Sequence, residues 1–182
     1  RHRTDAATAL PLTASVAGTG NIVLSRANGS LQLRSGGTAD GDMQVASAEQ
    51  IELASGQTVS VAGAATFTVT GSGNPLVLAG TLLAESVTLA AAGDITQTGG
   101  AIAHVTAGTE LPLTVNATGS GSVDLTSATN GTFALGASGA AGDFALTGEA
   151  IRLTGALTGG AVALTATTGA LALDGDMRAT QV

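Results

Sequence analysis

The sequence predicts an all-β fold, a right-handed parallel β-helix (a solenoid) of about seven or eight coils. First, a Gly followed by Asp or Asn and then an apolar residue recurs along the chain. Second, apolar-x-apolar pairs recur mostly every eight to eleven residues, which leaves room for a strand and a turn but not for a helix. The copies of the Gly-Asp/Asn motif are Gly20-Asn21-Ile22, Gly41-Asp42-Met43, Gly93-Asp94-Ile95, Gly142-Asp143-Phe144 and Gly175-Asp176-Met177.

The expected strands follow one another without a break. Residues 1–17 form an N-terminal segment with one lead-in strand, and residues 18–182 form the β-helical repeat domain. Apolar pairs that define strands begin at 22, 31, 43, 51, 59, 67, 76, 87, 113, 123, 133, 144, 151, 162 and 171. Gly, Ser, Asn or Asp stands at nearly every joint, as turns require.

A longer repeat is also visible. Residues 41–53 align with residues 142–153 when one residue is deleted. A coil of roughly 20 to 25 residues with about three short strands fits these spacings. At about 4.8 Å per rung, seven or eight such coils form a rod some 35 Å long.

The composition agrees with a narrow tube. Ile, Leu and Val suit stacked inward rows, Ala and Gly suit corners, and Thr and Ser suit an exposed pleated surface. Only three residues are aromatic Phe, and there is no Trp or Tyr. A β-sandwich is the alternative, but it would favour longer strands, an aromatic core and no repetition between distant segments.

Charge and composition exclude several function classes. The net charge is −7, with six Arg, no Lys and no Cys, so we expect no nucleic-acid binding and no disulfide or thiolate-metal chemistry. No apolar run reaches twenty residues, so no transmembrane helix is expected. The chain opens on Arg1-His2-Arg3 without a Met or a signal peptide, which predicts a processed product or a fragment.

The Thr/Ala/Gly-rich units, such as Gly93-Asp94-Ile95-Thr96-Gln97-Thr98-Gly99-Gly100, resemble the shafts of bacterial filamentous haemagglutinin-type adhesins and autotransporter passengers. The resemblance covers about residues 18–178 and rests on composition and repeat pattern. It implies secretion to the cell surface, a β-helical rod, and a role in adhesion, biofilm or surface assembly. The secretion domain that normally opens such proteins is not recognisable.

One tetrapeptide sequence, Asp-Gly-Asp-Met, occurs twice, as Asp40-Gly41-Asp42-Met43 and as Asp174-Gly175-Asp176-Met177. Two carboxylates on a tight turn make Asp40, Asp42, Asp174 and Asp176 weak Ca²⁺ candidates. The favoured interpretation is a structural turn, in which Asp hydrogen-bonds its own backbone and Gly adopts a positive φ. The two tetrapeptides are expected to mark equivalent positions near the two ends of the helix.

No residue set predicts catalysis, so we expect neither an enzyme nor a cofactor. His2 and His104 stand alone, without metal-ligand spacing, and His104 is expected to face outward. Glu49, Glu85 and Glu149 share one repeat position, which favours a structural role over a glycosidase pair. The sequence Asn130-Gly131-Thr132 and two similar triplets match the glycosylation pattern, but we interpret them as turns.

The predicted function is structural, a secreted subunit or shaft of a bacterial surface fibre that assembles by end-to-end stacking of open rungs. Its partner is another copy, head to tail, or the rest of a longer adhesin. The alternative is an adhesin fragment that binds a glycan or host protein laterally, with residues 99–122 around Pro112 as the loop that interrupts the rungs. The predicted assembly ends comprise Leu10, Leu12, Val16, Ile22 and Leu24 at one end, and Leu171, Leu173, Met177 and Val182 at the other.

Overall fold

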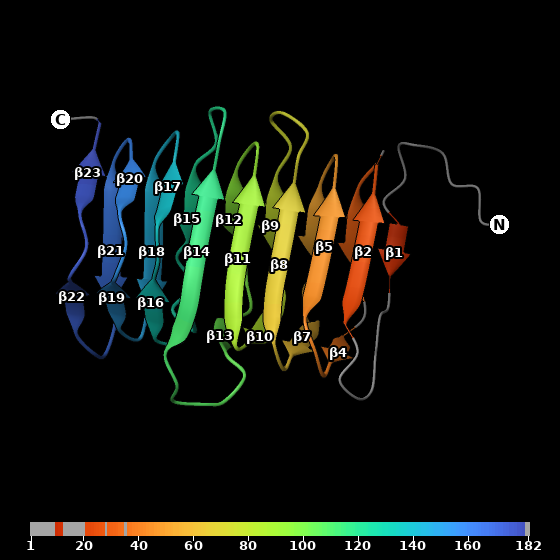
Figure 1. Cartoon of the computed structure of the whole chain (residues 1–182), viewed down its shortest axis with the longest axis horizontal. Helices are drawn as coiled ribbons and strands as arrows, with labels where there is room; N and C mark the ends of the chain where they lie inside the picture. Colours follow the sequence, from red (N-terminus) through yellow and green to blue (C-terminus); the bar gives the residue numbers. More distant parts are fainter. Residues whose placement is uncertain (1–9, 13–20, 28, 35, 181–182) are drawn as a thin grey trace.

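The computed structural model describes residues 10–12, 21–27, 29–34 and 36–180. This part of the chain contains 23 strands and no helix. Every strand pair is parallel, and the chain winds as a right-handed solenoid of about seven turns (Figure 1). The predicted parallel β-helix is therefore confirmed, and the β-sandwich alternative, whose sheets are antiparallel, is wrong.

The strands stack into three sheets, which form the sides of the tube. Sheet A contains β1 (Leu10–Leu12), β3 (Leu31–Leu33), β6 (Ile51–Leu53), β9 (Leu76–Leu78), β12 (Ile95–Gln97), β15 (Val123–Leu125), β18 (Phe144–Gly148) and β21 (Val162–Ala166). Sheet B contains β4 (Gly37–Ala39), β7 (Thr58–Val61), β10 (Thr81–Ala84) and β13 (Ile102–His104).

Sheet C begins with single strands and ends with two strands per turn. Its main path contains β2 (Ile22–Arg26), β5 (Met43–Ser47), β8 (Ala64–Val69), β11 (Ser86–Ala91), β14 (Leu111–Ala117), β16 (Phe133–Leu135), β19 (Ile151–Leu153) and β22 (Leu171–Leu173). A branch after β14 contains β17 (Ser138–Ala140), β20 (Leu157–Gly159) and β23 (Met177–Ala179).

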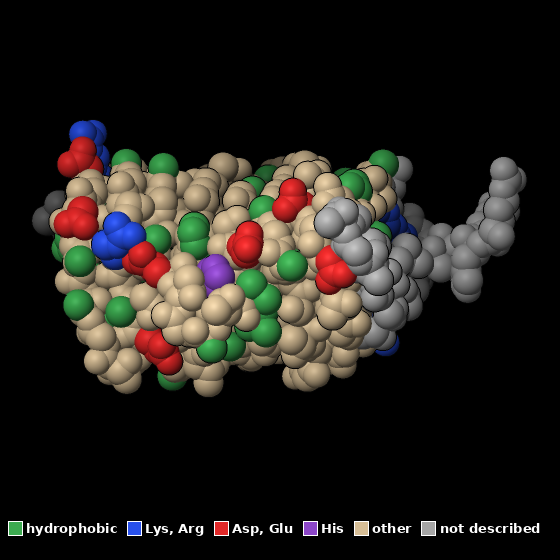
Figure 2. All heavy atoms as spheres, turned by 60° about the horizontal axis from the view of Figure 1, so that its bottom comes forward, with side chains coloured by type: hydrophobic (Ala, Val, Ile, Leu, Met, Phe, Trp, Pro, Cys, Tyr) green, Lys and Arg blue, Asp and Glu red, His purple; other side chains and the backbone are tan. Residues whose placement is uncertain are grey.

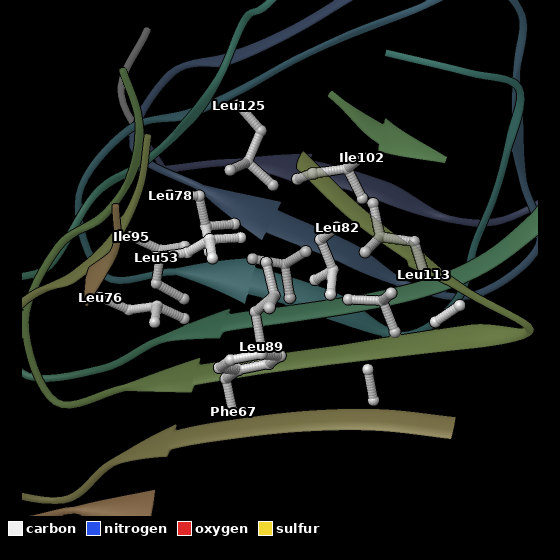
Figure 3. Packing of buried hydrophobic residues seen from close by; sticks show 14 of the residues in the cluster. Leu53, Phe67, Leu76, Leu78, Leu82, Leu89, Ile95, Ile102, Leu113 and Leu125 are labelled. Atoms are coloured by element: carbon white, nitrogen blue, oxygen red, sulfur yellow. The ribbon is translucent and has the colours of Figure 1, made fainter. Parts of the chain in front are cut away.

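The core is a set of apolar columns that run along the tube. Inward residues alternate with outward ones, as in β14, where the odd-numbered residues are buried and the others are not. All three Phe residues of the chain are buried. Figure 3 shows side chains from the three sheets converging inside the tube, among them Leu53, Leu78, Leu82, Ile102, Leu89 and Leu113.

Stacking is in register from turn to turn. One column of sheet A consists of Leu10, Leu31, Ile51, Leu76, Ile95, Val123, Phe144 and Val162. One column of sheet C consists of Ile22, Met43, Ala65, Val87, Leu113, Leu135, Leu153 and Leu173. Because β1 starts the first column, sheet A begins inside the predicted lead-in segment.

The path of the chain changes once, in residues 102–140, which we call the strand switch. Before it, the long strand of each turn lies in sheet C, as in the five-residue β5, and sheets A and B hold shorter strands. Within it, sheet B ends at β13, and β14 pairs with β16 along its first half and with β17 along its second half. After it, the long strand lies in sheet A, as in the five-residue β18.

The switch explains what the sequence repeat means in space. In residues 41–53 the long strand β5 belongs to sheet C and the following β6 to sheet A. In residues 142–153 the long strand β18 belongs to sheet A and the following β19 to sheet C. The same sequence unit has moved to a different side of the tube.

Candidate functional site

The Gly-Asp/Asn motif connects successive turns. The Asp42 Oδ1 accepts a hydrogen bond from the Ala64 backbone N at 2.9 Å, and the Asp143 Oδ1 accepts one from Ala161 N at 2.8 Å. Asn21 and Asp94 do the same for Asp42 N and Ser122 N, each at 2.9 Å. The donor always lies one turn further along the chain, so we call this contact the inter-turn staple.

The Gly before the staple is required by close approach of the turns. A Cβ on Gly93, the residue before Asp94, would overlap with the backbone carbonyls of Gly73 and Asn74, one turn earlier, and a Cβ on Gly175 would overlap with that of Gly155. The carbonyl oxygen cannot move aside without breaking the ladder, so a larger residue is excluded at these corners. The motif therefore joins successive turns. The predicted turn is wrong in its contacts, because Asp42 and Asp143 bind amides of the next turn and not their own backbone. The motif glycines Gly93 and Gly142 also lack the predicted positive φ.

The weak Ca²⁺ candidates do not come together. Within the described residues, no three His, Cys, Asp or Glu side chains are grouped to hold a metal ion. Asp42 already binds a backbone amide through its carboxylate. The two Asp-Gly-Asp-Met tetrapeptides are not at equivalent positions, so that prediction is wrong. Met43 starts the long strand β5, whereas Met177 starts the short branch strand β23. The register also differs, since Met43 shares its column with Leu173 and not with Met177.

Buried polar side chains gather at the strand switch. The described residues bury four such side chains, of which Asn130 and Ser138 lie in the switch and Gln97 shortly before it; the fourth is Ser47. The amides of Gln97 and Asn130 form two reciprocal hydrogen bonds, of 2.8 and 2.9 Å.

Asn130 takes the place of a missing strand. No strand follows β13 in sheet B, so the Ile102 amide has no carbonyl of a next rung. Asn130 Oδ1 accepts that amide hydrogen at 2.9 Å, and Gly131 N donates to Ile102 O at 3.0 Å. The Asn130 Nδ2 also donates to Thr147 O at 3.0 Å, one turn on. Asn130 is buried, with 1% of its surface exposed, so it is not a glycosylation site of the folded chain.

Ser138 does the same for sheet C. β14 is longer than β16, and its Val115 amide faces the gap between β16 and β17. The Ser138 hydroxyl accepts a hydrogen bond from Val115 N at 3.0 Å, in a buried position. Two short polar side chains therefore satisfy the backbone amides that the switch would otherwise leave unpaired.

The interruption of the rungs lies beside Pro112 and not at it. Pro112 is an outward residue inside β14, and the pairing of β14 with β11 begins one residue later, at Leu113. Its missing N–H therefore costs no bond with β11. The segments outside the ladder are 105–110 and 126–132, which flank a surface hollow of about 180 Å³.

The hollow is polar and contains the isolated histidine. His104, Thr109, Thr129, Thr132 and Glu149 contribute to its lining. Thr106 N donates to His104 Nδ1 at 2.9 Å, and the same ring nitrogen lies 3.2 Å from Thr106 O. Glu49, Glu85 and Glu149 lie on different turns, as their shared repeat position predicts, and form no carboxylate pair.

An ion pair on the outer surface connects the switch to the turn that follows it. Arg152 donates to both carboxylate oxygens of Glu110, at 3.0 and 2.5 Å. In the register of sheet C, Arg152 lies beside Ala134, and Ala134 lies beside Pro112, two residues after Glu110. The ion pair therefore spans two turns and passes over the small side chain of Ala134. The hydrogen bond and charge of Glu110 raise the pKa of Arg152 above its ordinary value. Elsewhere, the face in Figure 2 shows scattered acidic side chains on an uncharged surface.

The last described turn is open. Leu171, Leu173 and Met177 are 44%, 51% and 49% exposed, although the residues at the same places one turn earlier are fully buried. At the other end Ile22 is buried and Leu24 is partly buried. Leu10 and Leu12 lie in β1, while Val16 and Val182 fall outside the described residues. No helix in the described part is long and apolar enough to cross a membrane.

No protein-family model, curated protein or solved structure matches this chain. The sequence pattern locates the Gly-Asp/Asn motif but gives no indication that Asn130 and Ser138 are structural residues of the switch. One signal was present, since Gln97 stands in a column whose earlier members are Leu33, Leu53 and Leu78.

Proposed function

We propose that the chain is a structural segment of a secreted bacterial surface fibre or adhesin, a shaft that lengthens by end-to-end stacking of β-rungs. The continuous ladder of parallel rungs around one apolar core is the observation that carries this proposal. In the last described turn, the large apolar side chains Leu171, Leu173 and Met177 are about half exposed, whereas the same positions one turn earlier are buried under another rung. Exposed apolar surface beside unpaired strand edges favours addition of a further parallel rung.

The rest of the molecule supports a mechanical role. The tube has one continuous apolar core, inter-turn staples on two of its sides, and no group of metal-binding side chains within the described residues. Such a rod holds its two ends at a fixed separation. The resemblance to haemagglutinin-type shafts fits the same role.

Electron microscopy of the purified chain at high and low concentration tests the proposal. End-to-end stacking predicts fibres with an axial repeat near 35 Å, because about seven turns of about 4.8 Å make one subunit. The fibres should shorten on dilution. Short discrete rods at every concentration would contradict assembly and leave only the shaft role.

A second function is supported by the hollow beside the switch. It is the place where loops 105–110 and 126–132 interrupt the rungs, and its hydroxyl, imidazole and carboxylate groups suit the hydroxyls of a glycan. A glycan array with the wild-type chain and the Glu149→Gln variant tests it. Binding that the variant reduces would favour a lateral adhesin, and absence of binding to every glycan would dismiss this function.

A further inference from the structure

We propose that Asn130 is a modification site controlled by folding: the folded strand switch protects it from deamidation, and deamidation in the opened state prevents the switch from closing again. The inference is independent of what the shaft binds or how it assembles. It follows from the residue after Asn130, from the contacts of its amide and from the charge that deamidation creates.

Asn130 is followed by Gly131, and Asn-Gly is among the most reactive dipeptides for spontaneous loss of the Asn amide. The chain has five Asn, and only Asn28 and Asn130 precede a Gly. In the reaction Gly131 N attacks Asn130 Cγ, the bond from Cγ to Nδ2 breaks, and ammonia leaves. Water then opens the cyclic succinimide at either of its carbonyl carbons, which gives Asp or isoaspartate. Gly permits the attack because it has no Cβ to hinder its nitrogen.

The folded chain holds both reacting groups. Gly131 N donates its hydrogen to Ile102 O at 3.0 Å. Asn130 Oδ1 accepts from Ile102 N at 2.9 Å. Asn130 Nδ2 donates to Leu125 O at 3.3 Å and to Thr147 O at 3.0 Å. These bonds fix the amide, and an exposure of 1% keeps out the water that the second step needs. Deamidation therefore requires the switch to open first.

The opening can be local. Residues 126–132 lie outside the ladder, and Ala128 and Thr129 beside Asn130 are exposed. Segments with few ladder bonds open more often than the sheets that they join. Because one segment carries both Asn130 and Gly131, its opening releases the amide and the attacking nitrogen together. The rate of deamidation in native buffer then reports how often this segment opens.

The product cannot restore the native contacts. A carboxylate at residue 130 has no N–H, so its oxygen would face Gln97 Oε1, Leu125 O and Thr147 O, to which Nδ2 now donates. Its negative charge would also be buried among amide and backbone groups, which is strongly unfavourable. Isoaspartate lengthens the backbone by an added atom and would displace Gly131 N from Ile102 O.

Deamidation therefore makes a long opening of the switch irreversible. A chain whose switch opens briefly keeps its amide and regains every contact on closing. A chain that stays open long enough to lose the amide cannot close, and the turns from β16 onward no longer stack on the turns before the switch.

Peptide mapping by mass spectrometry tests the protection. The chain is kept at neutral pH in native buffer and in urea, and conversion of Asn130 to Asp and isoaspartate is followed in time. In urea we expect a rate similar to that of Asn28, which carries the same dipeptide. In native buffer we expect a rate for Asn130 that is at least about tenfold lower. Equal rates for Asn130 in urea and in native buffer would overturn the protection.

Refolding after the urea incubation tests the irreversibility. Circular dichroism after removal of urea should show a loss of refolded chains that follows the deamidated fraction at Asn130. Gly131→Ala is the matched control, because its Cβ hinders the attack at Asn130 and leaves the reaction at Asn28 unchanged. That Cβ would lie 3.1 Å from Ala103 Cβ, so a fresh sample is first shown to refold.

The Asn130→Asp variant supplies one product directly and decides the same point without incubation. Protection in native buffer, loss of refolding in the wild type alone and a lowered urea midpoint of Asn130→Asp support the proposal. A wild-type midpoint for Asn130→Asp would overturn the irreversible step. Equal losses of refolding in the wild type and Gly131→Ala would assign the loss to Asn28 and overturn it as well.

Discussion

The turns before the strand switch and the turns after it are built from the same sequence unit but present it on different sides. In β5 and β6 the long strand lies in sheet C and the short one in sheet A, and in β18 and β19 the assignment is reversed. The repeat pattern therefore determines the order of strand lengths along the chain. It does not determine where on the tube each strand lies.

The position of each strand is set by what happens between the two halves. A strand of sheet B is left out after β13, so the following strands advance by one side of the tube. Leaving out a strand exposes backbone amides to an apolar interior, which costs stability unless another group binds them. Asn130 and Ser138 are those groups, and the two halves of the rod depend on them to share one core.

The largest effect is expected from Asn130→Ala. The substitution removes the acceptor of the Ile102 amide and leaves the buried Gln97 amide without its partner. We expect a loss of about 3 kcal/mol in the free energy of unfolding, since several buried groups become unsatisfied. Urea unfolding followed by circular dichroism measures it.

Asn116→Ala is the matched control for this experiment. Asn116 is an outward, exposed residue of β14 near the same switch, so its loss should change stability little. Equal losses from the two substitutions would show that the switch does not depend on the buried amide. A loss of the second half alone, seen as two unfolding transitions, would show that Asn130 couples the halves.

A smaller effect is expected from the staples, and it should be similar in the two halves. Asp42→Ala in the first half and Asp143→Ala in the second each remove one hydrogen bond to a backbone amide. Each should lower the unfolding free energy by about 1 kcal/mol, the usual net contribution of one intramolecular hydrogen bond, because both carboxylates are at least partly exposed to solvent. The measurement is again the urea midpoint.

The conservative variants Asp42→Asn and Asp143→Asn supply the control, because an amide oxygen accepts the same hydrogen bond. They should recover most of the loss. If the Asn variants were as unstable as the Ala variants, charge rather than the hydrogen bond would hold the turns together. A loss in one half only would show that the staple depends on the side of the tube.

The sequence predicted what is periodic and missed what is not. The parallel β-helix and the inward columns follow from repetition of residue types, and the structure confirms them. The same repetition locates the Gly-Asp motif, but it does not show that the Asp side chain binds an amide of the next turn. The switch depends on single residues at unrepeated places. Asn130 looks like an ordinary Asn-Gly turn, and only a partner 33 residues away, Gln97, shows its role. A local pattern carries no information about such a contact.

The smallest effect is expected from Arg152→Ala, and its smallness sharpens the comparison of buried and exposed bonds across the switch. The pair joins Glu110, within the switch, to Arg152, on the turn after it, but the two side chains are 32% and 46% exposed. Solvent-exposed ion pairs contribute little and are screened by salt. An Arg guanidinium stays charged at every working pH, and Glu110 raises the pKa of Arg152 further, so the response to salt measures the strength of the pair. We expect no resolvable change in the urea midpoint at physiological salt and a small loss at low salt, with Arg178→Ala as the control for removing a cation. A loss that persisted in high salt would mean that the surface bridge, and not only the buried amide and hydroxyl groups, holds the two halves in phase.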